Sequence, residues 1–348
     1  MFSLESLIRP HILKLKPYTS AKDEYEGSEG VFLDANENPI GSATAEPFNR
    51  YPDPYQRLVK AKLAHIKHCL PEQVFMGNGS DEPIDLLYRA FCNPHHDNVV
   101  ITPPTYGMYE VSGEINAIEL RKANLTPQFE LDADLVLSQV DDRTKLIFLC
   151  SPNNPTGNLL NSQAVEKILR HFKGLVVIDE AYIDFAPQAT WLKRLNEFAN
   201  LVVLQTFSKA WGLAALRLGL AFASPAIIKI LNKIKSPYNV NILSQQYALQ
   251  ALDHEARKNQ MVNEMLQLRE ELIQDLQAIA CVKQVYPTDA NFILIKVTDA
   301  NAIYKYLIDR QVIVRNRSTA THCENCLRVS VGTIEENHIL VKYLRGWQ

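Results

Sequence analysis

The sequence predicts an α/β fold of two parts, a large domain with a mostly parallel central sheet and a smaller α+β domain. Between about residues 70 and 225, short apolar runs alternate with longer amphipathic stretches. This alternation is typical of parallel strands that are buried on both faces and joined by helices. After about residue 240 the pattern changes to a long charged helical stretch and shorter elements, and the length of 348 residues suits about two domains.

The large sheet is expected to contain six strands, because six runs are almost wholly apolar. They are residues 74–76, 99–101, 146–149, 175–178, 201–204 and 218–223. Between two of them, residues 161–172 place Ala164, Ile168 and Leu169 at helical spacing, with polar side chains on the opposite face. This spacing predicts an amphipathic helix that covers one face of the sheet.

The second part of the chain is expected to form its own small sheet. The predicted elements are a helix over 255–278, a strand over 291–295, a helix over 300–309 and strands over 312–314 and 327–331. The first 30 residues are polar, contain prolines and show no sustained periodicity. We therefore predict an N-terminal arm over 1–30, a large domain over 31–240 and a small domain over 241–348.

Composition excludes several classes of partner. Lys and Arg number 36 against 39 Asp and Glu, a net charge of −3, which does not suit a nucleic acid. The least polar stretch, 211–223, is shorter than the ~20 apolar residues that a membrane span needs. Glu5 and Pro10 interrupt the N-terminus where a signal peptide would be continuously apolar. We expect no nucleic acid or membrane partner.

The six cysteines are scattered through the chain and are expected to be reduced thiols of a cytoplasmic protein. Cys323 and Cys326 form a C-x-x-C pair that follows His322. A zinc site would need a second pair of ligands at similar spacing, and the sequence has none. We expect a loop with two thiols and no metal.

Polar side chains follow four of the predicted strands, at the sheet edge where α/β proteins bind ligands. The four segments are 77–82, 151–157, 179–182 and 205–209. Asp179 follows a buried strand, where its carboxylate needs a cationic partner such as a protonated ring nitrogen. Without the other polar segments, Asp179 would be interpreted as the cap of the next helix. Lys209 lies in apolar surroundings near Arg217, which would lower its pKa and make it a nucleophile, although a Ser-Lys pair alone is often a solvated turn.

A phosphate site is also expected at this edge. The hydroxyls of Thr206 and Ser208, the Arg217 guanidinium and the amides of 79–81 at a helix start are suitable donors to a phosphate monoester. Three further groups complete the set. Lys209 can bond an aldehyde, Asp179 can pair with a pyridinium nitrogen, and Tyr182 can bond a phenolic oxygen. These groups together match pyridoxal 5′-phosphate.

The motifs at these positions resemble those of the fold-type I aminotransferases of the aspartate aminotransferase superfamily. The segments that match in order and spacing are Asn154-Pro155-Thr156-Gly157, Asp179-Glu180-Ala181-Tyr182 and Ser208-Lys209 followed by Arg217. Further segments are similar, along essentially the whole chain, to the histidinol-phosphate aminotransferase family. They are 33–39, Arg50-Tyr51-Pro52-Asp53, 77–82, 206–210 and 327–333.

The resemblance implies a role for each matching residue at the cofactor. Lys209 would bond the cofactor aldehyde and shuttle the proton between Cα and C4′, and Asp179 would pair with the ring nitrogen. Asn154 and Tyr182 would bond the 3′-oxygen. Tyr106 would stack on the ring, and the phosphate would be held by Ser80, Asp81, Thr206, Ser208 and Arg217. Tyr51 would come from the other subunit, so that a homodimer shares each active site.

The resemblance also implies the substrates: histidinol phosphate and 2-oxoglutarate, converted to imidazole-acetol phosphate and glutamate in histidine biosynthesis. Arg328 would bind the substrate carboxylate, and with Arg315 the substrate phosphate; alternatively, Arg315 is a surface cation. Tyr18 would lie near the substrate phosphate. Asn36 and Glu37 would line the imidazole pocket.

Two other enzymes on the same scaffold stay open: an aromatic amino acid aminotransferase and a threonine-phosphate decarboxylase. A regulator that only senses the cofactor is disfavoured, because the segment before Leu33 is too short for a helix-turn-helix domain. The sequence departs from the family at Gln205, where arginine is usual, and at Ala215, where glycine is common. We expect Gln205 to remove a charge near the cofactor and Ala215 to shift the phosphate-side loop.

Overall fold

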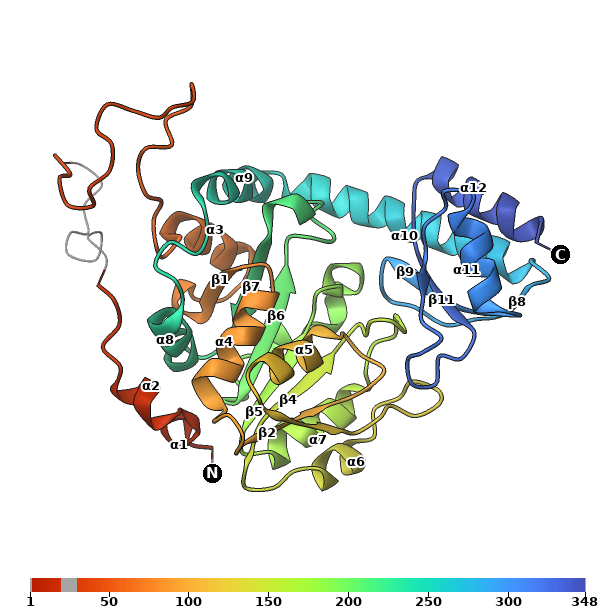
Figure 1. The fold of residues 1–348 in the computed structure, drawn as a ribbon, viewed down its shortest axis with the longest axis horizontal. Coiled ribbons are helices and arrows are strands. Elements are labelled where there is room, and N and C mark those ends of the chain that lie inside the picture. Colours follow the sequence, from red (N-terminus) through yellow and green to blue (C-terminus); the bar gives the residue numbers. More distant parts are fainter. Residues whose placement is uncertain (1, 20–29, 348) are drawn as a thin grey trace.

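The computed structural model describes residues 2–19 and 30–347, which form two β-sheets with helices around them (Figure 1). The larger sheet has the strand order β1-β7-β6-β5-β4-β2-β3. Its strands are β1 (Val74–Asn78), β2 (Asn98–Ile101), β3 (Glu119–Lys122), β4 (Thr144–Cys150), β5 (Leu175–Asp179), β6 (Leu201–Thr206) and β7 (Leu218–Phe222). The pairs from β3 to β6 are parallel and β7 is antiparallel to both neighbours. The predicted mostly parallel sheet is confirmed.

The central strands are apolar throughout because both of their faces are covered. In β5, Leu175 and Val177 pack into one core, whereas Val176 and Ile178 pack into another on the opposite face. Helices cover both faces: α3 (Arg57–Lys67), α4 (Asp81–Phe91), α5 (Met108–Ile115), α6 (Ala133–Ser138), α7 (Ser162–His171), α8 (Pro225–Ile234) and α9 (Ile242–Asp253). Within the described ranges, no helix is both long and apolar enough to cross a membrane.

The predicted amphipathic helix is α7, and its caps explain its bounds. The Asn161 side chain accepts hydrogen bonds from the N–H groups of Gln163 and Ala164 at the first turn. Edge strand β3 was not predicted, because its sequence, Glu-Leu-Arg-Lys, is mostly polar and only partly buried. A strand at the edge of a sheet needs no apolar run.

The smaller sheet has the order β10-β11-β9-β8 and is antiparallel throughout. Its elements are α10 (Glu255–Gln277), β8 (Val282–Val285), β9 (Phe292–Val297), α11 (Ala300–Ile308), β10 (Arg315–Asn316), β11 (Cys326–Ser330) and α12 (Ile334–Arg345). The strand predicted over 312–314 was wrong: pairing begins only at Arg315, opposite Arg328. The domain boundary at residue 240 stays a prediction.

The predicted arm lies partly outside the described residues, because 1 and 20–29 are not described. Its described part forms α1 (Leu4–Leu7) and α2 (Pro10–Lys14). Leu7 and Ile8 are buried in the core that also contains α4 and α8. The beginning of the arm therefore packs on its own chain.

The start of α4 lies very close to β7, which requires glycine at position 219. A β-carbon added to Gly219 would lie 2.1 Å from the carbonyl carbon of Gly79 and from the Ser80 nitrogen. Gly219→Ala must therefore push the 79–80 turn away, and we expect the free energy of unfolding to fall by about 1–3 kcal/mol. Urea unfolding measures this. Gly107→Ala is the control, because nothing lies within 4 Å of its added β-carbon; equal stability of the two variants would contradict the prediction.

Candidate active site

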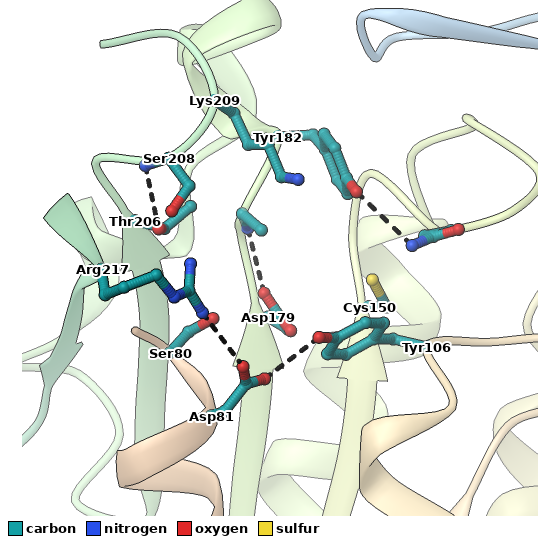
Figure 2. A pocket seen from close by; sticks show the side chains of 12 residues that line it. Ser80, Asp81, Tyr106, Cys150, Asp179, Tyr182, Thr206, Ser208, Lys209 and Arg217 are labelled. Atoms are coloured by element: carbon teal, nitrogen blue, oxygen red, sulfur yellow. Dashed lines mark hydrogen bonds and ion pairs between the residues drawn. The ribbon is translucent and has the colours of Figure 1, made fainter. Parts of the chain in front are cut away.

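One pocket opens where the carboxyl ends of β4, β5 and β6 meet the beginning of α4 (Figure 2). Its lining contains every residue that the sequence predicted for the cofactor except Tyr51. The lining residues are Ser80, Asp81, Tyr106, Cys150, Asn154, Asp179, Ala181, Tyr182, Thr206, Ser208, Lys209 and Arg217. Parallel strands bring their carboxyl ends to one edge, which is why segments 100 residues apart in sequence meet here.

The Lys209 amine extends into this pocket (Figure 2), and its Nζ lies 5.5 Å from the centroid of the Tyr182 ring. Burial lowers the pKa of Lys209, and the positive charges of Arg328 and Arg217 lower it further, against the opposite effect of Asp179. A lysine with a lowered pKa has more of its amine in the neutral, nucleophilic form. Lys209 is thus suited to attack a carbonyl carbon.

Asp179 is the last residue of β5 and is almost completely buried. Its Oδ2 accepts a hydrogen bond of 2.7 Å from the Tyr109 hydroxyl, and its Oδ1 accepts one of 3.0 Å from the Ala181 N–H. Burial raises the pKa of Asp179 to about 6, although both hydrogen bonds act in the other direction. A buried carboxylate held in this way favours a cation in the pocket.

The sequence did not predict two residues that lie beside Asp179, Tyr109 and Cys150. Tyr109 is completely buried and stacks on Phe148, with 4.9 Å between ring centroids. Its position three residues after Tyr106 is the one weak signal that could have suggested it. Cys150 ends β4 beside Asp179, and its thiol has a raised pKa because it is buried.

The opposite end of the pocket offers donors to an anion. Ser80 is the N-cap residue of α4, and its side chain caps no helix N–H. Arg217 Nη2 lies 3.4 Å from Asp81 Oδ2, whose Oδ1 accepts a hydrogen bond of 3.0 Å from Tyr106 (Figure 2). The helix start, the Ser80 hydroxyl and this guanidinium together favour a phosphate-sized anion.

Thr206 differs from the other predicted phosphate residues, because both sides of its hydroxyl are already used. Its Oγ1 donates to the Leu218 carbonyl at 3.0 Å and accepts from the Ser208 N–H at 3.1 Å. Thr206 therefore orients the turn that presents Ser208. Ala215 belongs to a single 3₁₀ turn, Ala214–Leu216, immediately before Arg217.

A chain of hydrogen bonds joins the pocket to the smaller sheet. Arg328 Nη1 donates to Asn154 Oδ1, and Asn154 Nδ2 donates to the Tyr182 hydroxyl at 3.4 Å. Arg328 is half-buried on β11, and burial lowers its pKa. Arg315 lies opposite Arg328 but is exposed. The structure therefore joins Arg328 directly to the pocket, and Arg315 only through the neighbouring strand.

Besides Arg315 and Arg328, which are not among the lining residues, four more predicted residues do not line this pocket within the single chain. Asn36, Glu37 and Tyr51 line a separate surface hollow, where Glu37 binds Arg50 at 2.7 Å and Tyr51 stacks on Tyr238. Tyr18 is exposed and lines another small hollow. The lining of the main pocket thus contains no residue before Ser80.

Gln205 does not line this pocket, so the expected loss of charge occurs elsewhere. Its Nε2 donates at 2.9 Å to Glu180, which is completely enclosed and also accepts from the Thr190 hydroxyl at 2.7 Å. Burial raises the pKa of Glu180 to about 7. Because Gln205 stands in place of arginine, the buried Glu180 carboxyl has no cationic side chain among its direct hydrogen-bond partners within the described residues.

Because the buried Glu180 has a raised pKa, we expect the stability of the protein to depend on pH. Between pH 4.5 and about 7 the unfolded chain loses the Glu180 proton while the folded chain keeps it, so the free energy of unfolding falls as pH rises through that window. Glu180→Gln, which cannot ionise, should show a smaller fall. Urea unfolding at pH 5 and pH 8 measures the difference. The exposed Glu264→Gln is the control, and an unchanged pH dependence in Glu180→Gln would contradict the prediction.

Comparison with known proteins agrees with this arrangement. The sequence model of one family, described as aminotransferase class I and II, matches residues 24–344. The chain belongs to this family. The aminotransferase activity expected from the motifs is thereby confirmed at the level of the family.

Individual members of the family cover the chain almost completely. A histidinol-phosphate aminotransferase of Cytophaga hutchinsonii is 53% identical over 346 residues, 99% of this chain and 99% of that protein. One of Bacteroides thetaiotaomicron is 53% identical over 349 residues and covers 100% of both chains.

Solved structures share the fold at lower identity. The Clostridium acetobutylicum histidinol-phosphate aminotransferase has a TM-score of 0.79 at 21% identity, covering 86% of this chain and 90% of that one. The Sinorhizobium meliloti enzyme, in complex with pyridoxal-5′-phosphate, has a TM-score of 0.78 at 21% identity, covering 97% and 96%. The predicted fold type is thus confirmed.

Proposed function

We propose that this aminotransferase uses pyridoxal 5′-phosphate to move the amino group of histidinol phosphate to 2-oxoglutarate, giving imidazole-acetol phosphate and glutamate in histidine biosynthesis. The observation that carries the proposal is that Lys209 and Asp179 line one pocket. The full-length relatives of 53% identity support the choice of substrate. The six cysteines form no disulfide with one another in the structure, which supports the proposed cytoplasmic location.

The residues of the pocket fit this cofactor. When bound, it supplies an aldehyde that takes up an amino group and a ring that accepts the electron pair released at the substrate carbon. Lys209 would hold the aldehyde carbon and would move the proton at the substrate carbon. The Asp179 carboxylate would hold the proton on the ring nitrogen, and Tyr109 orients that carboxylate through the hydrogen bond of 2.7 Å.

The other residues would position the cofactor. Ser80, Ser208, Arg217 and the amide of Asp81 at the beginning of α4 would hold its phosphate, on the turn shaped by Thr206. Asn154 and Tyr182 would hold its 3′-oxygen, and Tyr106 would cover its ring. Because Arg328 donates to Asn154, a substrate anion bound at Arg328 would lie beside the reacting carbon.

We further propose that the enzyme is a homodimer in which Tyr51 of a second copy reaches the cofactor phosphate. The separate hollow that contains Tyr51, Asn36 and Glu37 supports this, since these residues do not reach the pocket of their own chain. Several exposed apolar side chains from the same region also favour burial by a second copy: Val31, Leu33, Ile40, Phe48, Leu58 and Leu243. Tyr18 would approach the substrate phosphate from the arm.

Initial rates on three amino donors test the proposed substrate. We expect kcat/KM for histidinol phosphate, with 2-oxoglutarate as acceptor, to exceed that for phenylalanine and for threonine phosphate by at least about 100-fold. A preference for phenylalanine would instead identify an aromatic amino acid aminotransferase. Release of carbon dioxide from threonine phosphate would identify a decarboxylase, and either result would overturn the proposal.

A further inference from the structure

Three arginines lie close together where β10 and β11 approach the active site. Arg315 on β10 is paired with Arg328 on β11, so the two side chains lie on the same face of the sheet. Arg317 follows Arg315 by two residues, and its N–H donates to the Cys326 carbonyl at 2.9 Å, which continues the strand pairing. Because strand residues two apart share a face, Arg317 joins the other two arginines there.

Arg317 and its neighbour have polar atoms that the chain does not satisfy. Arg317 Nε, Ser318 Oγ and Arg328 Nε are buried and have no hydrogen-bond partner among the described residues. Buried polar atoms in native proteins nearly always have a partner, whether protein, water or ligand. Arg315, in contrast, is exposed to solvent. The half-buried Arg317 is therefore better placed than Arg315 to meet a ligand on this face.

The charge of Arg317 acts on Tyr182, a residue that lines the pocket. The pKa of Tyr182, raised mainly by burial, is lowered by the charges of Arg328 and Arg317. Burial lowers the pKa of Arg317, and the charge of Arg315 lowers it further. Within the described part of the chain, none of the three arginines forms an ion pair with a carboxylate of the protein. Three guanidinium groups without carboxylate partners favour a multiply charged anion.

We infer that Arg317 is a specificity residue that binds the phosphate of the amino donor together with Arg328. This inference rests on the proposed function and adds to it. A carboxylate carries one negative charge and is matched by one guanidinium, whereas a phosphate monoester near neutral pH carries almost two. Arg317 supplies the second buried cation that the phosphate requires and the α-carboxylate of glutamate does not. It distinguishes the two substrates that must use the same site in turn.

The test combines removal of Arg317 with removal of the substrate phosphate. Arg317→Gln, Arg317→Lys and wild type are compared on histidinol phosphate, on histidinol and on glutamate. We expect Arg317→Gln to raise KM for histidinol phosphate by about 10- to 100-fold, as for one charge-assisted hydrogen bond, and to change KM for glutamate and for histidinol less than about threefold. Arg317→Lys should recover part of the loss. The exposed Arg310→Gln on the same domain is the matched control.

The outcomes separate the inference from the proposed function. If wild type does not use histidinol phosphate, the proposed function fails and the inference fails with it. If wild type uses it, an Arg317→Gln variant with unchanged KM, or with equal increases for phosphorylated and unphosphorylated donors, overturns the inference alone. Thermal unfolding and the visible spectrum of the bound cofactor check that each variant is folded and loaded.

Discussion

Replacing Lys209 with alanine is expected to lower turnover by more than about 10³-fold, because the variant loses the amine proposed to hold the cofactor and to move the proton. The pocket contains no second amine among its lining residues that could take its place. The direct measurement is covalent attachment. After borohydride reduction, the intact mass of the wild type should increase by one reduced cofactor, whereas that of Lys209→Ala should not.

The control for this experiment is Lys229→Ala, an exposed lysine on α8. It should retain both the mass increase and the activity. A Lys209→Ala protein that still gained the cofactor mass at one site, or that still turned over near the wild-type rate, would place the reactive amine elsewhere and would remove the basis of the proposed function.

Asp179→Asn is expected to produce the second largest loss, more than about 100-fold in turnover. The neutral amide cannot balance a proton on the ring nitrogen, and the buried position offers no other carboxylate to do so among the residues in contact with it. Cofactor affinity should fall as well, which equilibrium dialysis measures independently of the reaction.

A smaller change at the same carboxylate separates its charge from its orientation. Tyr109→Phe keeps the Asp179 charge and removes one hydrogen bond of 2.7 Å, so we expect a loss of about tenfold. If Asp179→Asn and Tyr109→Phe had equal effects, orientation and not charge would explain the role of Asp179. If Asp179→Asn kept a tenth or more of the wild-type turnover, the pairing with a ring nitrogen would be wrong.

The local pattern of the sequence was sufficient for the central strands and for the side chains that follow them. Apolar runs such as 175–178 predicted β5, and the chemical contrast of Asp179 directly after that run marked a ligand site. The edge strand β3 and the start of β10 at Arg315 were not predictable in this way. Their pairing depends on which strand lies beside them, and neither has an apolar run.

The sequence by itself was sufficient for the apolar central strands and for marking Lys209 and Asp179 as candidate site residues, because each of these follows from residue type and the neighbours in sequence. Only the tertiary structure decided what those groups contact. Tyr109 reaches Asp179 from another segment, Gln205 binds Glu180 and not the pocket, and Arg317 lies half-buried on the face it shares with Arg328. Contacts between distant segments depend on how helices and sheets pack, and no local spacing encodes that packing.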